Sequence, residues 1–475
     1  MASEKETTEV TAAEPSSSDS FQSTDNMAVD NADGKRPPPL VAKLVAVFLI
    51  SCISFGSHWS SGVTGAMKST LKKKMDITNT QFSLLEASEN FMATVLLLAG
   101  GIVTDRVGGA PAATTVRSFN FMIGGRIILA LGDIATQTAQ YKMFSSWFPP
   151  SNGFASTLGF ELAIGKIGGF VGKSTANIIA KNTGDFAWVF WTSVFMNLFT
   201  NAATCFFWLF NRYCEKHFRG REDTATQETL TEKNKKFEIR KMFQLPWMFW
   251  AVLAFSMFQT STASVFSSNA TELAQKRFNV DAIKAGWYSS LAQYAGIFIS
   301  MVLVNFAESK QGTAAAFGMY AVAVSLGPTS IIDGIRTTLW HQSVFGSAYA
   351  LKVTMNNAMT IIIGIITGAL QDADNDSYRR SVRVYLFLAI CCAIVSILLL
   401  IGSMIGRDLA PLQWTRKRRL ASGAEYIAKL REHHLVTHYQ RSRTISICCF
   451  TGLVLLVIGS WAAYIWGAVT GNNPS

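Results

Sequence analysis

Apolar runs about as long as a bilayer is thick constrain this chain more than any other feature. A transmembrane helix needs about 20 predominantly apolar residues, and runs of that length recur between residues 44 and 468. Hydrophobic residues make up 49% of the 475, which together with these runs excludes a soluble protein with one large core. In lipid every backbone polar group needs an internal partner, which a helix provides. We therefore expect an all-α, polytopic membrane protein.

The basic residues are gathered in connecting segments. The formal net charge is +11, but Lys and Arg concentrate in loops, as is typical of the cytosolic side of a membrane protein. No nucleic acid partner is expected. The predicted parts are a disordered cytosolic tail at 1–39, a transmembrane half at 40–210, a basic cytosolic linker at 211–244, a second transmembrane half at 245–406, a basic amphipathic segment at 407–444 and one extra span at 445–475.

Two isolated charges lie near the middle of two long apolar helices. Asp133 belongs to the helix that begins near Phe121, and Lys166 belongs to the helix that ends near Ala180. Such charges are costly in hydrocarbon, so they face a bundle interior or a water-filled cavity and mark functional sites. Two opposite charges on neighbouring helices suit the two ends of a small zwitterion. The alternative is that Asp133 and Lys166 pair with each other and stabilise the fold.

The stretch GGIVTDRVGG, residues 100–109, is the sharpest motif in the chain. An Asp and an Arg at a cytosolic helix end can pair across a loop and hold two helices together in one conformational state. The spacing G-x-x-x-D-R-x-G around Asp105 and Arg106 resembles the loop signature of the major facilitator superfamily. Arg126, in GRIILALG, resembles the Arg of the fourth-helix motif of the same superfamily. The resemblance implies a fold of two helical halves in which Asp105, Arg106 and Arg126 are latch residues.

Further segments resemble the lysosomal dipeptide transporter branch of that superfamily. They are residues 125–133, residues 163–169 and WHQSVFGSAYALKVTMNNAM, residues 340–359. In that branch an acid on the fourth helix and a base on the fifth engage the two ends of a dipeptide, and by motif position these become Asp133 and Lys166. A Lys in place of Arg exchanges a bidentate grip for a point charge. The resemblance implies uniport across the lysosomal or vacuolar membrane and an accessory glycosylated membrane subunit.

Other polar residues within the spans are candidates for the substrate site or for proton coupling. Glu89 lies deep on the second helix, whereas Glu86 is expected near its lumenal end and solvated. Glu89 and His58 could carry a proton, and the alternative for each is a hydrogen bond within the fold. Five polar residues of the second half could hydrogen-bond a peptide amide or join helices to one another. They are Gln259, Gln293, Tyr294, Asn356 and Asn357.

Two N-x-[ST] sequons predict glycosylation. Asn269 follows the span expected at residues 245–268, and Asn375 precedes the span expected at 384–404. In the superfamily's topology both loops face the lumen or the exterior, where glycans are attached.

The stretch GKIGGFVGKST, residues 165–175, superficially resembles a phosphate-binding loop. The P-loop spacing needs a glycine where Ile167 stands, and no strand precedes it. The glycines instead predict a face for close helix packing in lipid. The sequence contains no HExxH, GxSxG or Cys/His metal spacing, so we expect no enzyme, no cofactor and no metal.

The spacing of the motifs leaves little chain for a complete superfamily fold. About twenty residues separate Arg106 from Arg126, and a single apolar run at 313–332 stands where a ninth and a tenth helix are expected. Each half is therefore expected to lack its third helix. Five spans in the first half would place the linker outside, against the charge rule. We favour an incomplete sequence as the explanation; the alternatives are that residues 107–121 re-enter the membrane as a short broken segment or that the protein no longer transports.

Together these features predict a secondary transporter that moves small zwitterionic solutes, dipeptides above all, by alternating access. A proton-coupled carrier of organic anions is the first alternative, with Lys166 holding the anion and Glu89 or His58 the proton. A non-transporting membrane scaffold or receptor is the second. The expected partners are a small-molecule substrate and the lipid bilayer.

Overall fold

The computed structural model describes five long stretches of the chain and several short pieces. They are residues 38–100, 154–218, 245–291, 345–406 and 439–471, with 122–127, 130, 140, 143–144, 147–148, 327–328, 330–339, 408–414, 418, 421, 425–426, 428–429 and 432. The helices of the first half are α1 Leu40–Cys52, α2 Phe55–Ala66, α3 Lys68–Met75, α4 Asn79–Gly100, α6 Phe154–Thr183 and α7 Ala187–His217. Those that follow are α9 Trp247–Phe278, α10 Ala282–Leu291, α13 Phe345–Ala373, α14 Arg379–Ile405, η3 Ala410–Gln413 and α16 Tyr439–Gly471.

Six stretches of these residues are long and apolar enough to cross a membrane. They are Leu40–Ala66, Ala187–His217, Trp247–Phe278, Ser347–Ala373, Arg379–Ile405 and Arg443–Gly471. They confirm the all-α, polytopic class that the apolar runs predict. The last stretch corresponds to the extra C-terminal span.

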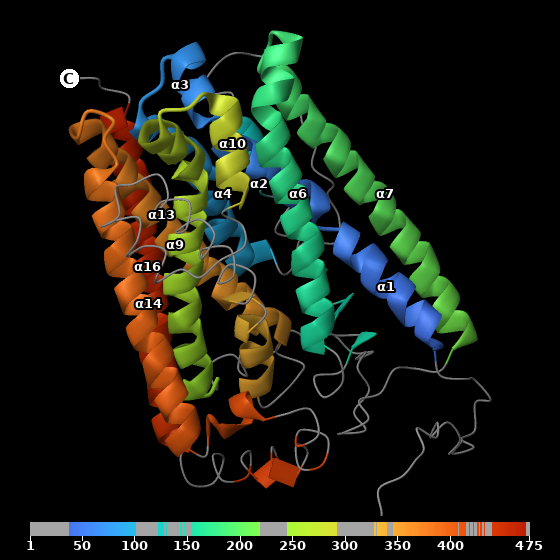
Figure 1. Ribbon diagram of the computed structural model, residues 1–475. Helices are drawn as coiled ribbons and strands as arrows, with labels where there is room; N and C mark the ends of the chain where they lie inside the picture. The colour runs from blue at the N-terminus through green and yellow to red at the C-terminus, as the bar shows by residue number, and fades with distance from the viewer. Residues whose placement is uncertain are drawn as a thin grey trace, which may run out of the picture.

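The long helices run side by side, so the bundle has two ends (Figure 1). α3 lies at one of them, which we call the α3 end. α1 begins, α7 ends and α9 begins at the opposite end, which we call the linker end. The first half therefore begins and ends on the same side of the bundle. The two helices expected to be missing fall on residues 101–121 and 292–326, which lie outside the described residues.

The first span is broken between α1 and α2. At the break the carbonyl of Ile50 keeps one backbone hydrogen bond, from Ile53 N at 3.2 Å, whereas the backbone N–H of Gly56 is in the first turn of α2, where no acceptor within the helix is available. Gln140 Nε2 donates to Ile50 O at 2.9 Å, and Gly56 N donates to Thr200 Oγ1 at 3.0 Å. In lipid a broken helix is tolerated where neighbouring helices satisfy the freed groups in this way.

Helices α2 and α6 cross with their backbones in contact. A Cβ atom built on Gly62 would lie 2.5 Å from the carbonyl oxygen of Gly169, and one built on Gly172 would lie 2.8 Å from that of Trp59. Any side chain at these positions would force the helices apart. The packing role predicted for the glycines of residues 165–175 is therefore confirmed.

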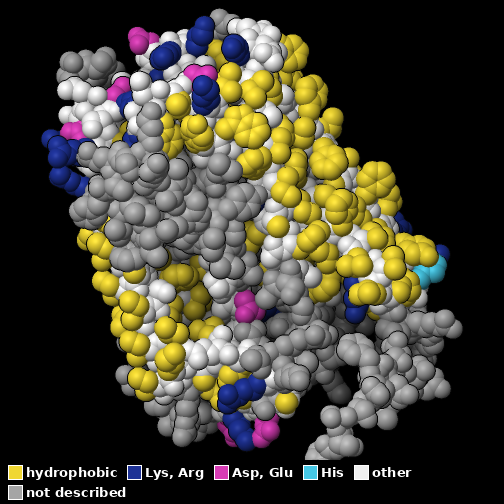
Figure 2. Space-filling model, in the orientation of Figure 1, with side chains coloured by type: hydrophobic (Ala, Val, Ile, Leu, Met, Phe, Trp, Pro, Cys, Tyr) yellow, Lys and Arg dark blue, Asp and Glu magenta, His cyan; other side chains and the backbone are white. Residues whose placement is uncertain are grey.

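Hydrophobic side chains cover much of the described surface on the face seen in Figure 2. The charged side chains visible in this view lie mostly toward the two ends of the bundle. The exposed hydrophobic residues of α7 and α14 include Trp188, Phe195, Leu198, Phe199, Phe206, Phe387, Ile390, Ile394, Ile397 and Leu398. Such a surface is stable against lipid tails and unstable in water, as expected for a protein embedded in a bilayer.

The extra span packs against both halves. Trp461 Nε1 of α16 donates to Thr94 Oγ1 of α4 at 3.1 Å. A Cβ atom on Gly467 of α16 would lie 3.1 Å from the side chain of Ile365 on α13. α16 therefore covers the line along which α4 and α13 meet.

Candidate functional site

The two halves meet along a seam formed by α4 with α13 and by α6 with α10. Close approach is possible at Gly368 of α13, because a Cβ atom there would lie 3.0 Å from the carbonyl oxygen of Asn79 on α4. Transporters of two similar halves bind their solutes between the halves near the bilayer midplane. Polar and charged side chains on this seam are therefore the candidates for a site.

Lys68 of the first half is inserted into the second half at the α3 end. Its side chain is fully buried, and its Nζ atom lies 3.1 Å from Glu272 Oε2. The same ammonium donates to Asn269 Oδ1 at 2.6 Å, Gln371 Oε1 at 2.8 Å and Tyr378 OH at 3.3 Å. All four partners belong to the second half, so this side chain ties the halves together.

A second layer of ion pairs surrounds Lys68. Lys72 Nζ lies 3.2 Å from Glu272 Oε1 and 2.7 Å from Asp376 Oδ1. Partial burial opposes the charge of Lys72, but the two carboxylates outweigh it and raise the pKa of Lys72. Asn79 at the start of α4 donates through its backbone N–H to Asp372 Oδ1 at 2.9 Å, where a negative charge is favourable at a helix N-terminus.

We call this set of residues the α3-end seal. Its members are Lys68, Lys72 and Asn79 of the first half and Asn269, Glu272, Gln371, Asp372, Asp376 and Tyr378 of the second. A buried ion pair contributes little net stability, yet removing one of its partners is costly. Each charge in the seal therefore depends on its partner in the other half, and the seal joins the two halves at this end.

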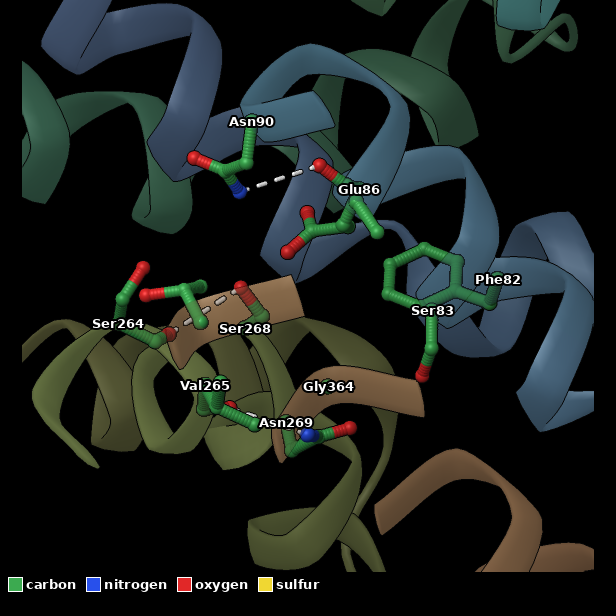
Figure 3. A pocket seen from close by; sticks show the side chains of 11 residues that line it. Phe82, Ser83, Glu86, Asn90, Ser264, Val265, Ser268, Asn269 and Gly364 are labelled. Carbon is green, nitrogen blue, oxygen red and sulfur yellow. Dashed lines mark hydrogen bonds between the residues drawn. The ribbon is translucent and has the colours of Figure 1, made fainter. Parts of the chain in front are cut away.

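A cleft lies on the seam next to the seal (Figure 3). It contains about 370 Å³ of empty space, including its open mouth. The lining residues are Phe82, Ser83, Glu86, Ala87 and Asn90 of α4, Ser264, Val265, Ser268 and Asn269 of α9, and Thr360 and Gly364 of α13. The Glu86 side chain faces Ser268 of α9 across the cleft.

Charges of both signs lie around this cleft. Lys173 Nζ of α6 donates to the backbone carbonyl and to the hydroxyl of Ser267, both at 2.8 Å, and it interacts electrostatically with Glu86. Arg126 Nη1 lies 2.7 Å from Glu89 Oε2 and also donates to the hydroxyl of Thr64. Two residues expected to act separately, the latch residue Arg126 and Glu89, thus form one pair.

Lys166 lies closer to the linker end, beside other polar groups of the first half. It interacts electrostatically with His58 and with Glu161. Glu161 is 1% exposed and accepts hydrogen bonds from Ser54 Oγ at 2.9 Å and Gln140 Nε2 at 3.3 Å. His58 packs against Gly165, where any Cβ atom would overlap its ring.

The second half contributes one cation to this region. Lys352 of α13 is 9% exposed and interacts electrostatically with Glu161 across the seam. Its Nζ atom lies 5.2 Å from the centre of the Tyr349 ring. Charged side chains therefore lie along the seam from the α3-end seal to Lys166.

Several predicted site residues lie outside the described residues. They are Asp105, Arg106, Asp133, Gln293 and Tyr294. Asn356 is described and buried, and its Nδ2 atom donates to Ser256 Oγ at 3.0 Å, which joins α13 to α9. Gln259 is also buried in α9.

The expectation that Asn269 is glycosylated is wrong. α9 continues ten residues past the expected end at Ser268, to Phe278. Asn269 is therefore inside a helix and 5% exposed, and it donates to Tyr385 OH at 3.0 Å while accepting from Lys68. A glycan needs an exposed acceptor. Asn375 is exposed in the turn before α14 and stays a predicted acceptor.

The expectation that Glu86 is solvated is also wrong, because the side chain is partly buried and faces α9 across the cleft (Figure 3). Sequence reasoning further missed Lys68, Glu272 and Lys173. Only Lys173 had a local signal, because it follows Lys166 by seven residues on α6 and so lies on the same helix face.

Across the described residues, no group of three or more His, Cys, Asp and Glu side chains could hold a metal ion. The groups on the seam are instead hydrogen-bond acceptors and cations, held on helices from both halves. Such an arrangement can bind the charged ends of a small polar molecule without breaking or forming covalent bonds.

A family model described as Major Facilitator Superfamily matches residues 47–400. Lysosomal dipeptide transporter MFSD1 of Homo sapiens is 23% identical over 411 residues, which cover 76% of this chain and 86% of that protein. The protein of the same name from Bos taurus is 23% identical over 452 residues, which cover 85% and 92%.

A solved structure of a bacterial homologue of the human lysosomal transporter Spinster, in an inward-facing and occupied conformation, matches with a TM-score of 0.45 and 11% identity, over 91% of this chain and 98% of that one. The family match spans more than half of the chain. This protein therefore belongs to the Major Facilitator Superfamily and is a membrane transporter rather than an enzyme.

Proposed function

We propose that the protein moves small zwitterionic solutes, dipeptides above all, across the lysosomal or vacuolar membrane by alternating access. The observation that supports this most is the row of fully or partly buried charges of both signs along the seam, from Glu86 and Lys173 to Glu161 and Lys166. Intramembrane charges are retained where they serve a transported solute. The names of the relatives, at 23% identity, support the dipeptide and the lysosome.

Lys166 is the proposed anchor for the carboxylate end of the solute, and Asp133 is the proposed anchor for the amino end. An empty site can be held closed by these same charges, with Lys166 interacting with a carboxylate of the fold such as Glu161. The carboxylate of a zwitterion then takes the place of Glu161 beside Lys166, while its amino group pairs with Asp133. This exchange offers the solute a binding site without leaving an unpaired charge in the bilayer.

Alternating access requires one end to close while the other opens. The α3-end seal is the proposed barrier on one side. Asp105 and Arg106 are the proposed latch on the other. Arg126, the third predicted latch residue, pairs with Glu89 and donates to Thr64 next to α3, so we propose that it acts on the α3-end side of the site. The linker end is proposed to be cytosolic because the basic linker joins helix ends there.

Counterflow in proteoliposomes tests the proposal. Vesicles loaded with unlabelled dipeptide are expected to accumulate labelled dipeptide, and Lys166→Ala is expected to reduce the initial rate at least tenfold. Lys181→Ala is the matched control, because Lys181 is on the same helix and exposed. Equal rates in the two variants would remove Lys166 from the site, and no flux through correctly folded protein would favour the scaffold or receptor.

A proton-coupled carrier of organic anions is the second candidate. It is favoured by the two lysines of α6, Lys166 and Lys173, which a helix separates by about 10 Å, and by the position of His58 next to Lys166. Here Lys166 binds the anion, and Glu89 or His58 carries the proton. Uptake that requires a pH gradient and is lost in His58→Gln or Glu89→Gln would favour this candidate over uniport.

A further inference from the structure

We propose that the cleft at Glu86 binds the ammonium group of the transported solute and that Glu86 selects solutes with a free amine. The proposal deepens the proposed function and rests on it for the statement that the bound solute is transported. It adds Glu86 to Asp133 as a second acidic group for the cationic end of the solute, on α4 and facing α9 on the α3-end side of the seam.

The lining of the cleft has the chemistry that an ammonium group needs. An ammonium has three donors and no acceptor, and the polar groups that face the cleft include the carboxylate of Glu86, the hydroxyls of Ser264 and Ser268 and the amide of Asn90 (Figure 3). Charge-assisted hydrogen bonds to a carboxylate are about twice as strong as neutral ones. Phe82 and Val265 supply an apolar wall for the carbon atoms next to the amine.

The carboxylate of Glu86 has no ion-pair partner among the described residues, whereas the neighbouring carboxylates of Glu89 and Glu272 each have one. Glu89 is ion-paired to Arg126 at 2.7 Å, and Glu272 is ion-paired to Lys68 at 3.1 Å. Within the described residues, Glu86 has no Lys or Arg at ion-pair distance, and Arg126 and Lys173 interact with it electrostatically from farther away. A carboxylate offers about four acceptor positions, so most of those on Glu86 can receive a ligand.

The electrostatic field across the cleft gives a zwitterion one orientation. Lys173 reaches Ser267 from α6, while Glu86 reaches the adjacent residue, Ser268, from α4. The same turn of α9 therefore lies between a cation and an anion. An amine is attracted toward Glu86 and away from Lys173, which directs the carboxylate end of the solute toward the two lysines of α6.

The position of the cleft links amine binding to the α3-end seal. Asn269 lines the cleft and also accepts a hydrogen bond from Lys68 at 2.6 Å. An ammonium bound at Glu86 lies beside this amide and close to the charge of Lys68, which it repels. Binding of a free amine is therefore expected to weaken the seal, whereas an acylated analogue has no such effect.

Ligand-dependent melting of the purified protein tests the site without requiring transport. The probes are glycylglycine amide and its N-acetyl counterpart, which differ in the positive charge. The proposal is supported if the free amine raises the melting temperature of the wild type, the N-acetyl compound does not, and the apparent affinity for the free amine falls at least tenfold in Glu86→Gln. Glu215→Gln, an exchange at the linker end outside the site, is the control and should behave like the wild type.

The remaining outcomes separate this proposal from the proposed function. Equal stabilisation of the wild type and Glu86→Gln, or none in either, overturns the amine site even if dipeptide counterflow is observed. Amine-selective stabilisation without counterflow supports the site and contradicts transport. If Glu86→Gln does not fold, Glu86→Asp and Ser268→Ala replace it, because both keep the negative charge in the cleft. Each should lower the apparent affinity for the free amine by less than tenfold. Unchanged affinity in both variants would contradict the proposal.

Discussion

Lys68 Nζ and Glu272 Oε2 lie 3.1 Å apart, with side chains 0% and 5% exposed, and they belong to different halves of the transporter. Because each is buried, neither can separate from the other without a new partner or access to water. The pair therefore reports the conformational state of the protein. The structure described above is closed at the α3 end.

Replacing Lys68 by Met is expected to open the α3 end more often. The exchange leaves Glu272 with Lys72 and Lys276 as its cations, at 3.2 and 3.8 Å. A membrane-impermeant maleimide added at the α3 side should modify Ser264→Cys in the cleft at least tenfold faster, which corresponds to about 1.4 kcal/mol. The background needs the seven native cysteines replaced. Lys73→Met, an exposed neighbour on α3, is the control, and equal labelling of both would contradict a role of Lys68 in the seal.

The pair of Lys72 with Asp376 predicts a loss of stability in acid. Partial burial opposes the charge of Asp376, but hydrogen bonds from Lys72 and Asn79 outweigh it, and the pKa of Asp376 is lowered. Its contribution is therefore present above the ordinary pKa of about 3.9 and is lost as the pH falls through the lowered value. Because the side chain is 49% exposed, the effect is about 0.2–1 kcal/mol.

Thermal melting of the wild type and Asp376→Asn from pH 7 downward measures this contribution. The wild type should melt higher at pH 7, and the difference should disappear in acid. A difference that grew on acidification would have the wrong sign and would exclude the ion pair as its cause.

An alanine at Gly62 is expected to destabilise the first half. Its Cβ atom would lie 2.5 Å from the carbonyl oxygen of Gly169, and overpacking of this kind costs about 1–3 kcal/mol. Gly159→Ala on α6 is the matched control, because nothing lies within 4 Å of a Cβ atom there. Size-exclusion profiles and melting temperatures in detergent should show a loss for Gly62→Ala and none for Gly159→Ala, and equal behaviour would contradict the close crossing of α2 and α6.

The two sequons are expected to behave differently. Asn375→Gln should remove the shift in gel mobility that peptide N-glycosidase produces, since Asn375 is exposed in a turn. Asn269→Gln should leave that shift unchanged but lower the melting temperature, because Asn269 bonds Lys68 and Tyr385 within the seal. A glycan lost in Asn269→Gln alone would show that α9 ends before this residue.

The sequence predicted the class of fold because hydrophobic length is a local property. It misplaced the end of α9, since the polar residues from Asn269 to Glu272 look like a loop when read alone. In the folded chain Lys68, some 200 residues earlier, pairs with Glu272 and donates to Asn269, so these polar side chains are satisfied inside a helix. No spacing rule connects positions so far apart.

The candidate site was predicted in part for the same reason. Lys166 and Glu89 are conspicuous as charges in apolar surroundings, and both lie among other polar groups near the seam. That Glu89 pairs with Arg126, and that Glu86 faces the cleft, depends on how α4 is rotated against its neighbours. Helix rotation follows from the packing of all the helices together.

The extra helix α16 has a mechanical consequence. Trp461 donates a hydrogen bond to Thr94 on α4, and Gly467 lies against Ile365 on α13. One helix therefore contacts both halves, which tilt relative to each other in alternating access. Each transport cycle has to slide at least one of these contacts along the surface of α16. We therefore expect α16 to affect the rate of the cycle, although none of its residues lines the cleft.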